Sequence, residues 1–96
     1  MRWIQASSVT KTITEENKYS NPVALQRKFN FSLTGTFVAT VVVQRSFDDG
    51  INWLDVATFT APGEFIGEEP EKNMRYRFGV KTGAYTSGSI IGRLSQ

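Results

Sequence analysis

The chain has 96 residues, with 11 basic and 9 acidic side chains, no cysteine and no histidine. At this length one domain is expected, and a second independent core does not fit. The missing residue types exclude disulfides, zinc fingers, thiolate nucleophiles and Ser-His-Asp catalysis. We therefore expect a binding or structural domain without enzymatic activity and without a cofactor. A net charge of only +2 does not favour nucleic-acid binding.

Apolar runs are short throughout the chain. No stretch of 18 apolar residues is present, so no membrane span is expected, and residues 1–8 lack the apolar segment of a secretory signal. These patterns predict a protein that is made and assembled in a cytoplasm.

Residues 1–27 show only weak strand patterns. Val9–Thr14 alternates weakly between apolar and polar positions, and residues 23–26 could form a short strand. Residues 15–22 are polar and end in Asn-Pro, which predicts a loop. We expect residues 1–27 to form an N-terminal arm with the first strands, and residues 28–96 to form the body of one domain.

The next segments alternate clearly. Lys28–Leu33 predicts a strand with Phe29, Phe31 and Leu33 on one face, followed by a turn at Thr34-Gly35. Thr36–Arg45 predicts a second strand. Its other face carries the apolar residues Val38 and Val42, so this strand is either central or covered by a partner.

Two turns divide the middle of the chain. Asp49-Gly50 is typical of a hairpin turn that returns into a strand over Asn52–Thr60. Ala61-Pro62-Gly63 predicts another turn. Residues 64–72 contain four glutamates and predict an exposed loop or a short edge strand.

The last third contains two further strands. In the first, apolar and basic residues alternate, with Arg75, Arg77 and Lys81 opposite the apolar face made by Met74, Tyr76, Phe78 and Val80. Residues 82–88 predict a loop and Ser89–Leu94 the final strand. About seven strands without a helix indicate an all-β fold, a single antiparallel β-sandwich.

Residues 46–53 resemble the Asp-box pattern S-x-D-x-G-x-T-W and depart from it at Asn52. The matching positions are Ser46, Asp48, Gly50 and Trp53. The resemblance implies a structural hairpin in which the acidic side chain ties the turn and the tryptophan packs beneath it. Sialidases carry several such boxes on propeller blades, whereas this chain has one, so a sialidase is not expected.

The segment Tyr76–Lys81 with the loop and strand after it is similar to the last two strands of immunoglobulin-like and fibronectin type III sandwiches. In that comparison Lys28–Leu33 corresponds to strand B, Thr36–Arg45 to strand C and Asn52–Thr60 to strand C′. Residues 28–94 as a whole resemble the small β-sandwich structural proteins of tailed bacteriophages. This resemblance implies a virion part, and most directly a capsid decoration (cement) protein.

That resemblance implies particular partners. The major capsid protein of the phage would be bound on the outside of the shell, and we expect a homo-oligomer, a dimer or a trimer. Neither nucleic acid nor a membrane is an expected partner. Two alternatives are a carbohydrate- or cell-surface-binding module of a fibre and a head–tail connector or tail subunit. The first would need exposed aromatic residues, for which the candidates are Tyr19, Trp53 and Tyr85, and of these Trp53 is expected to be buried.

Three groups of residues are candidates for the partner interface. They are the arm residues Arg2, Trp3 and Ile4, the apolar pair Val38 and Val42, and the basic residues Arg75, Arg77 and Lys81. Arginine and aromatic residues are enriched at interface anchors, and a basic patch can steer assembly. Each group also has an ordinary structural interpretation: an arm that packs back on its own domain, scattered surface residues, and a solvated face. The glutamates of residues 64–71 lack calcium-loop spacing, so no metal site is expected.

Overall fold

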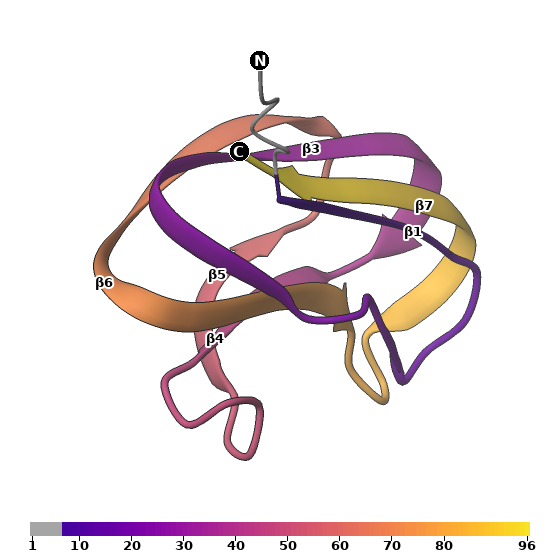
Figure 1. Ribbon diagram of the computed structural model, residues 1–96. Helices are drawn as coiled ribbons and strands as arrows, with labels where there is room; N and C mark the ends of the chain where they lie inside the picture. Colours follow the sequence, from indigo (N-terminus) through magenta and orange to yellow (C-terminus); the bar gives the residue numbers. More distant parts are fainter. Residues whose placement is uncertain (1–6) are drawn as a thin grey trace.

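The structure is a computed structural model, and it describes residues 7–96. The described chain is all-β and antiparallel, as the alternation predicts (Figure 1). Its strands are β1 (Ser8–Ile13), β2 (Lys18–Tyr19), β3 (Val23–Ala39), β4 (Val41–Ser46), β5 (Leu54–Phe59), β6 (Gly63–Val80) and β7 (Tyr85–Ser95). Within residues 7–96, no helix is long and apolar enough to cross a membrane.

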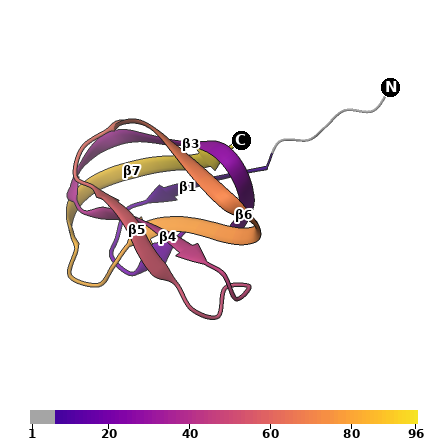
Figure 2. The same cartoon turned by 90° about the vertical axis from the view of Figure 1, so that its left-hand side faces the viewer.

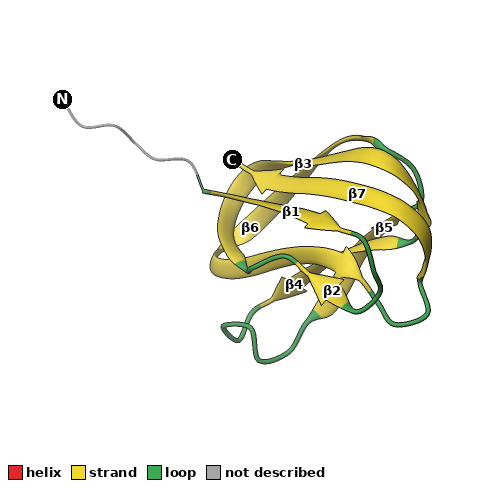
Figure 3. Cartoon of the chain, turned by 90° about the vertical axis from the view of Figure 1, so that its right-hand side faces the viewer, coloured by secondary structure: helices red, strands yellow, loops and turns green. Residues whose placement is uncertain are grey.

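The seven strands form one hydrogen-bonded sheet that folds over itself into two layers (Figures 2 and 3). The order is β1-β7-β3-β6-β4-β5, and β2 pairs separately with the end of β6. One layer contains β1, β7 and the second half of β3, which pairs with β7 over residues 30–39. The other contains β4, β5 and the end of β6, which pairs with β4 over residues 75–79. The long strands β3 and β6 therefore belong to both layers.

The passage of β3 and β6 between the layers takes place at a large bulge. Leu25 pairs with Met74, but the next paired residues are Arg27 and Glu69, so residues 70–73 stand opposite a single residue of β3. Arg27 and Asn73 both have positive φ, 65° and 63°. Extra residues in one strand bend it and increase its twist. The glutamate-rich segment 64–72, expected as a loop or short edge strand, is thus part of an 18-residue strand.

The predicted turn at Thr34-Gly35 is wrong, because β3 continues through it to Ala39. Gly35 has φ +105°, and a Cβ there would lie 2.2 Å from the Ser89 carbonyl oxygen on β7. Only glycine permits this close approach of two backbones within a strand. The chain changes direction instead at Thr40, whose N–H donates to the Ala84 carbonyl.

The predicted strand Thr36–Arg45 is therefore divided between β3 and β4, and the two parts lie in different layers. The other predicted boundaries differ less. β2 lies inside the expected loop 15–22, β7 begins at Tyr85, four residues before the predicted start at Ser89, and β1 pairs with β7.

The core lies between the layers and consists of the inward positions of the alternating strands. Phe29, Phe31 and Leu33 of β3 are buried, as predicted. The apolar face of β6 is buried as well, with Met74, Tyr76, Phe78 and Val80 at most 8% exposed. Burial of such side chains is worth roughly 1.5–3 kcal/mol each relative to exposure.

Candidate functional site

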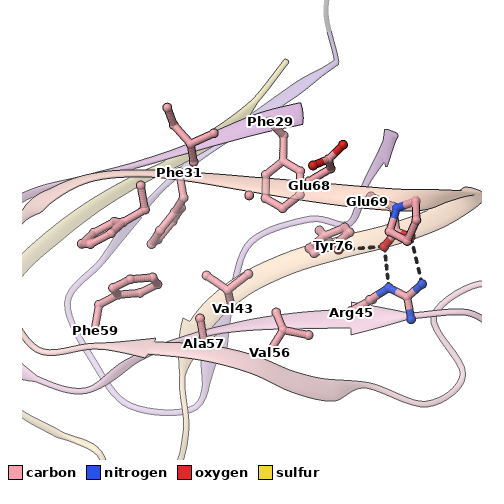
Figure 4. Close-up of a pocket in the computed structure, with 14 residues that line it drawn as sticks. Phe29, Phe31, Val43, Arg45, Val56, Ala57, Phe59, Glu68, Glu69 and Tyr76 are labelled. Carbon is pink, nitrogen blue, oxygen red and sulfur yellow. Dashed lines mark hydrogen bonds and ion pairs between the residues drawn. The ribbon is translucent and has the colours of Figure 1, made fainter. Parts of the chain in front are cut away.

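An apolar groove opens on one side of the molecule, between β4 and β5 on one wall and β3 and the first half of β6 on the other. Its volume is about 500 Å³. Three aromatic rings form its inner end: Phe59 lies with its ring centroid 4.0 Å from that of Phe65 and 5.4 Å from that of Phe31. Figure 4 shows Phe31, Phe59, Val43 and Ala57 facing the space between the walls.

Two sheet edges border this groove. β5 is the last strand in the sheet order and pairs only with β4. β6 pairs on one side with β3 through residues 63–69, and within residues 7–96 no strand pairs with the other side of that segment. Val56 on β5 is 49% exposed and Ile66 on β6 is 78% exposed. Free edges beside exposed apolar side chains are typical sites of strand addition.

A buried charge network closes the polar end of the groove. Glu69 is 1% exposed, and its carboxylate accepts from Nε and Nη2 of Arg45 and from the Tyr76 hydroxyl. The backbone N–H of Glu71 donates to the same carboxylate at 2.8 Å. Figure 4 shows Arg45 and Tyr76 converging on Glu69. Because the carboxylate sits at the bulge of β6, the network fixes the point where β3 and β6 change layers.

The network shifts the pKa values of its members in opposite directions. Hydrogen bonds from the Arg45 guanidinium lower the pKa of Glu69 to about 2, against the opposing effect of burial. Burial and the hydrogen bond to Glu69 raise the pKa of Tyr76 above its ordinary value. Glu69 thus stays ionised and Tyr76 stays protonated near neutral pH, which suits a structural ion pair.

The predicted hairpin of residues 46–53 is present, and its side chains tie the loop as the Asp-box resemblance implies. The Ser46 hydroxyl donates to Asp48 at 2.7 Å and accepts from the Gly50 N–H at 2.8 Å. Asp48 also accepts from the backbone and side-chain amides of Asn52, at 2.9 and 2.7 Å. These hydrogen bonds lower the pKa of Asp48 to about 2. Asp49 and Gly50 adopt positive φ, as the predicted turn requires.

The rigid hairpin loop presents two apolar side chains to solvent. Phe47 is 59% exposed and Ile51 is 79% exposed, and the loop extends beyond the body of the sandwich (Figure 1). Trp53 is half-buried at its base. The Arg77 guanidinium lies 4.4 Å from the Trp53 ring and 4.0 Å from the Tyr19 ring. One face of each aromatic ring is thus occupied by the chain's own arginine, which makes both rings poor platforms for a sugar.

The three basic candidates are engaged within the chain. Arg75 pairs with Asp49, and Lys81 pairs with Asp55, each at 2.5 Å. Arg77 donates to the Gln44 side chain at 2.8 Å in addition to its aromatic contacts. These contacts hold the hairpin against β6, so the expected cationic patch is largely neutralised.

The remaining candidates fall in three different places. Val38 lies near the end of β3 and is 59% exposed, as an interface residue would be. Val42 is only 2% exposed because its own chain buries it, so it does not offer the partner contact that the sequence suggests. The bend at Thr40 separates the two valines, so they do not share one strand face as the sequence predicts. Arg2, Trp3 and Ile4 lie outside the described residues.

Sequence reasoning missed the groove and the network beneath it. The sequence pattern places Glu69 among exposed glutamates, because its partner Arg45 is 24 residues away in the chain. The only local signal is its position: Phe65, Gly67 and Glu69 share the inward side of an alternating strand. In the described part of the chain, no group of three or more acidic residues is arranged to hold a metal ion.

Fold and site together define a small antiparallel β domain with a rigid projecting hairpin and an open apolar groove. No protein-family model, curated protein or solved structure matches the chain.

Proposed function

We propose that this chain is a non-enzymatic structural protein of a bacteriophage particle that decorates the outside of the capsid and bridges neighbouring capsid subunits. The sequence resemblance of residues 28–94 suggests the setting. The observation that carries the proposal is the hairpin loop, where a network of side-chain hydrogen bonds holds two exposed apolar residues, Phe47 and Ile51, away from the body.

A preorganised loop suits this task for an energetic reason. Binding orders side chains and loops at an interface, and a loop that is already fixed loses less entropy. Asp48 supplies that order, because its carboxylate accepts hydrogen bonds from Ser46 and Asn52. Large exposed apolar side chains at the tip can then fill pockets on a partner, as interface anchors do. Each decorating copy adds interface area across the joints of the shell.

The first experiment measures the copy number of this chain in purified virions against the major capsid protein, by quantitative mass spectrometry. A ratio of one per capsid subunit, or one per few subunits, supports decoration. About a dozen copies per particle would assign the chain to the tail or the connector, and absence from the particle would overturn the proposal.

A second experiment tests the hairpin itself. Capsids lacking the protein are incubated with the wild-type chain or with Phe47→Ser/Ile51→Asn, and bound protein is counted after pelleting. We expect the double variant to bind at least tenfold more weakly. Ile91→Asn is the matched control, since Ile91 is an exposed apolar residue of β7 outside the hairpin and is 42% exposed. Equal binding of all three chains would show that the hairpin does not dock.

A further inference from the structure

We propose that the free edge of β6 at residues 63–69 accepts the N-terminal segment of a second copy of this chain as an added antiparallel strand, with Trp3 entering the apolar groove. This inference deepens the proposed function, because it supplies the contact that would link decorating copies to one another. It concerns a different surface from the hairpin, so the two can be tested separately.

The edge has two chemically distinct sides. Glu64, Ile66 and Glu68 are exposed, whereas Phe65, Gly67 and Glu69 are the less exposed alternate positions, and residues 65–69 all border the groove. Ile66 is 78% exposed, in the middle of a segment whose second side has no strand partner within residues 7–96. An added strand would satisfy the backbone groups of this edge and cover Ile66 at the same time.

The sequence at the start of the chain complements this edge in one register. Alternate residues of a strand face opposite sides, so in the added strand Arg2 and Ile4 would share one side and Trp3 would face the other. Antiparallel pairing of Trp3 with Gly67 sets Ile4 opposite Ile66 and Arg2 opposite Glu68. An apolar pair and an opposite-charge pair then lie on the outer face, and each stabilises a sheet.

Gly67 gives the groove side of β6 no side chain of its own at this point. The Phe29 ring of β3 covers the glycine, since a Cβ there would lie 2.5 Å from that ring. The adjoining cavity, of about 500 Å³, is lined by aromatic and aliphatic residues. An indole that enters opposite Gly67 would pack beside Phe29 and fill part of this cavity.

Charge favours the same orientation. The groove cation Arg45 is already bound to Glu69 and Glu71. Glu68 makes no ion pair among the described residues. Arg2 would bring a positive charge to this glutamate.

Distance along the sheet favours a second copy as the source of the strand. Ser8 pairs with Ser95, Ser95 with Asn30, and Asn30 with Ile66, so Ser8 and Ile66 are three strand spacings apart along the sheet. The proposed position lies one spacing further, about 19 Å along the sheet at about 4.8 Å per spacing. Ile4 is four residues from Ser8, which is at most about 14 Å of extended chain. We therefore assign the added strand to a second copy.

The test uses the full chain at a series of concentrations. Sedimentation velocity measures self-association of the wild type and of Trp3→Ala, Ile66→Lys and the control Ile91→Lys. We expect a concentration-dependent oligomer for the wild type and the control, and association at least tenfold weaker for the other two. Circular dichroism confirms that each variant is folded. A wild type that stays monomeric at every concentration, or an Ile66→Lys variant that associates normally, would overturn the proposal.

Two further measurements test the register. In a Trp53→Phe chain Trp3 is the only tryptophan, and its emission should shift to the blue as the oligomer forms; emission that is already blue-shifted in the dilute monomer would contradict exchange between copies. Arg2→Glu should weaken association, and adding Glu68→Arg should restore it; no restoration would exclude the Arg2–Glu68 pair. Capsid binding through the hairpin is measured independently, so failure here leaves the proposed function standing.

Discussion

The Arg45 guanidinium binds both oxygens of the Glu69 carboxylate at the point where the sheet changes layers. Arg45 belongs to β4 and Glu69 to the bulge of β6, so the pair joins the two walls of the groove at its polar end. Because this is the buried ion pair of the described chain, it gives the protein a definite response to acid.

We predict that the free energy of unfolding falls as the pH is lowered from about 4.5 towards 2. The pKa of Glu69 is lowered from 4.5 to about 2 in the folded chain, so the unfolded chain binds the proton first. The stabilisation is complete above the unfolded pKa and is lost as the pH falls to the folded one. Urea unfolding at pH 6, 4 and 3 measures this slope. The Glu69→Gln variant should show a smaller slope, and an unchanged slope would refute this assignment.

The second prediction concerns Arg45→Met. This change leaves the buried Glu69 carboxylate without its cation, which typically costs about 3–5 kcal/mol. It should also shrink or reverse the loss of stability between pH 4.5 and 2, since without the hydrogen bonds from Arg45 the pKa of Glu69 in the folded chain rises. Arg75→Met is the matched control, because the Arg75–Asp49 pair is exposed and worth at most about 1 kcal/mol. Equal losses in the two variants, measured by urea unfolding, would contradict the role given to Glu69.

A third prediction separates steric from conformational effects of glycine. Gly35 and Gly83 both have positive φ, 105° and 84°, but a Cβ at Gly83 meets nothing within 4 Å. Gly83→Ala should cost on the order of 1 kcal/mol for the backbone conformation alone. Gly35→Ala should cost clearly more, because its Cβ would overlap the Ser89 carbonyl of β7. The melting temperatures of the two variants are compared by thermal unfolding. Equal values would mean that β3 and β7 can move apart at this point without a loss of stability.

The fourth prediction concerns the hairpin loop. Asp48→Ala removes the acceptor of the Asn52 and Ser46 hydrogen bonds, so the Asn52 backbone amide should exchange with solvent faster. Asp49→Asn removes the exposed ion pair with Arg75 but keeps a residue that tolerates positive φ, so it should leave that amide protected. Hydrogen exchange followed by NMR measures both. If the ordered loop is the docking surface, Asp48→Ala should also weaken capsid binding. An Asn52 amide that stays protected in Asp48→Ala would show that other contacts hold the loop.

The sequence predicts those parts of the fold that depend on local patterns. The alternation of Phe29, Phe31 and Leu33 identifies the inward face of β3, and the Asp-box spacing identifies the hairpin. The sequence wrongly predicts a turn at Gly35, because a glycine in a turn and a glycine at a close approach of two strands look alike in sequence. Glu69 could not be recognised as buried, because its ionic partner and the bulge that holds it arise only when β4 meets β6.

The two long strands have a consequence for how the domain comes apart. Since β3 and β6 each run through both layers, pulling one layer open breaks strands that the other layer shares. Neither layer is a separate foldon, so one layer cannot open while the other stays folded. The molecule should therefore unfold as one cooperative unit, which is a useful property for a domain subjected to mechanical load.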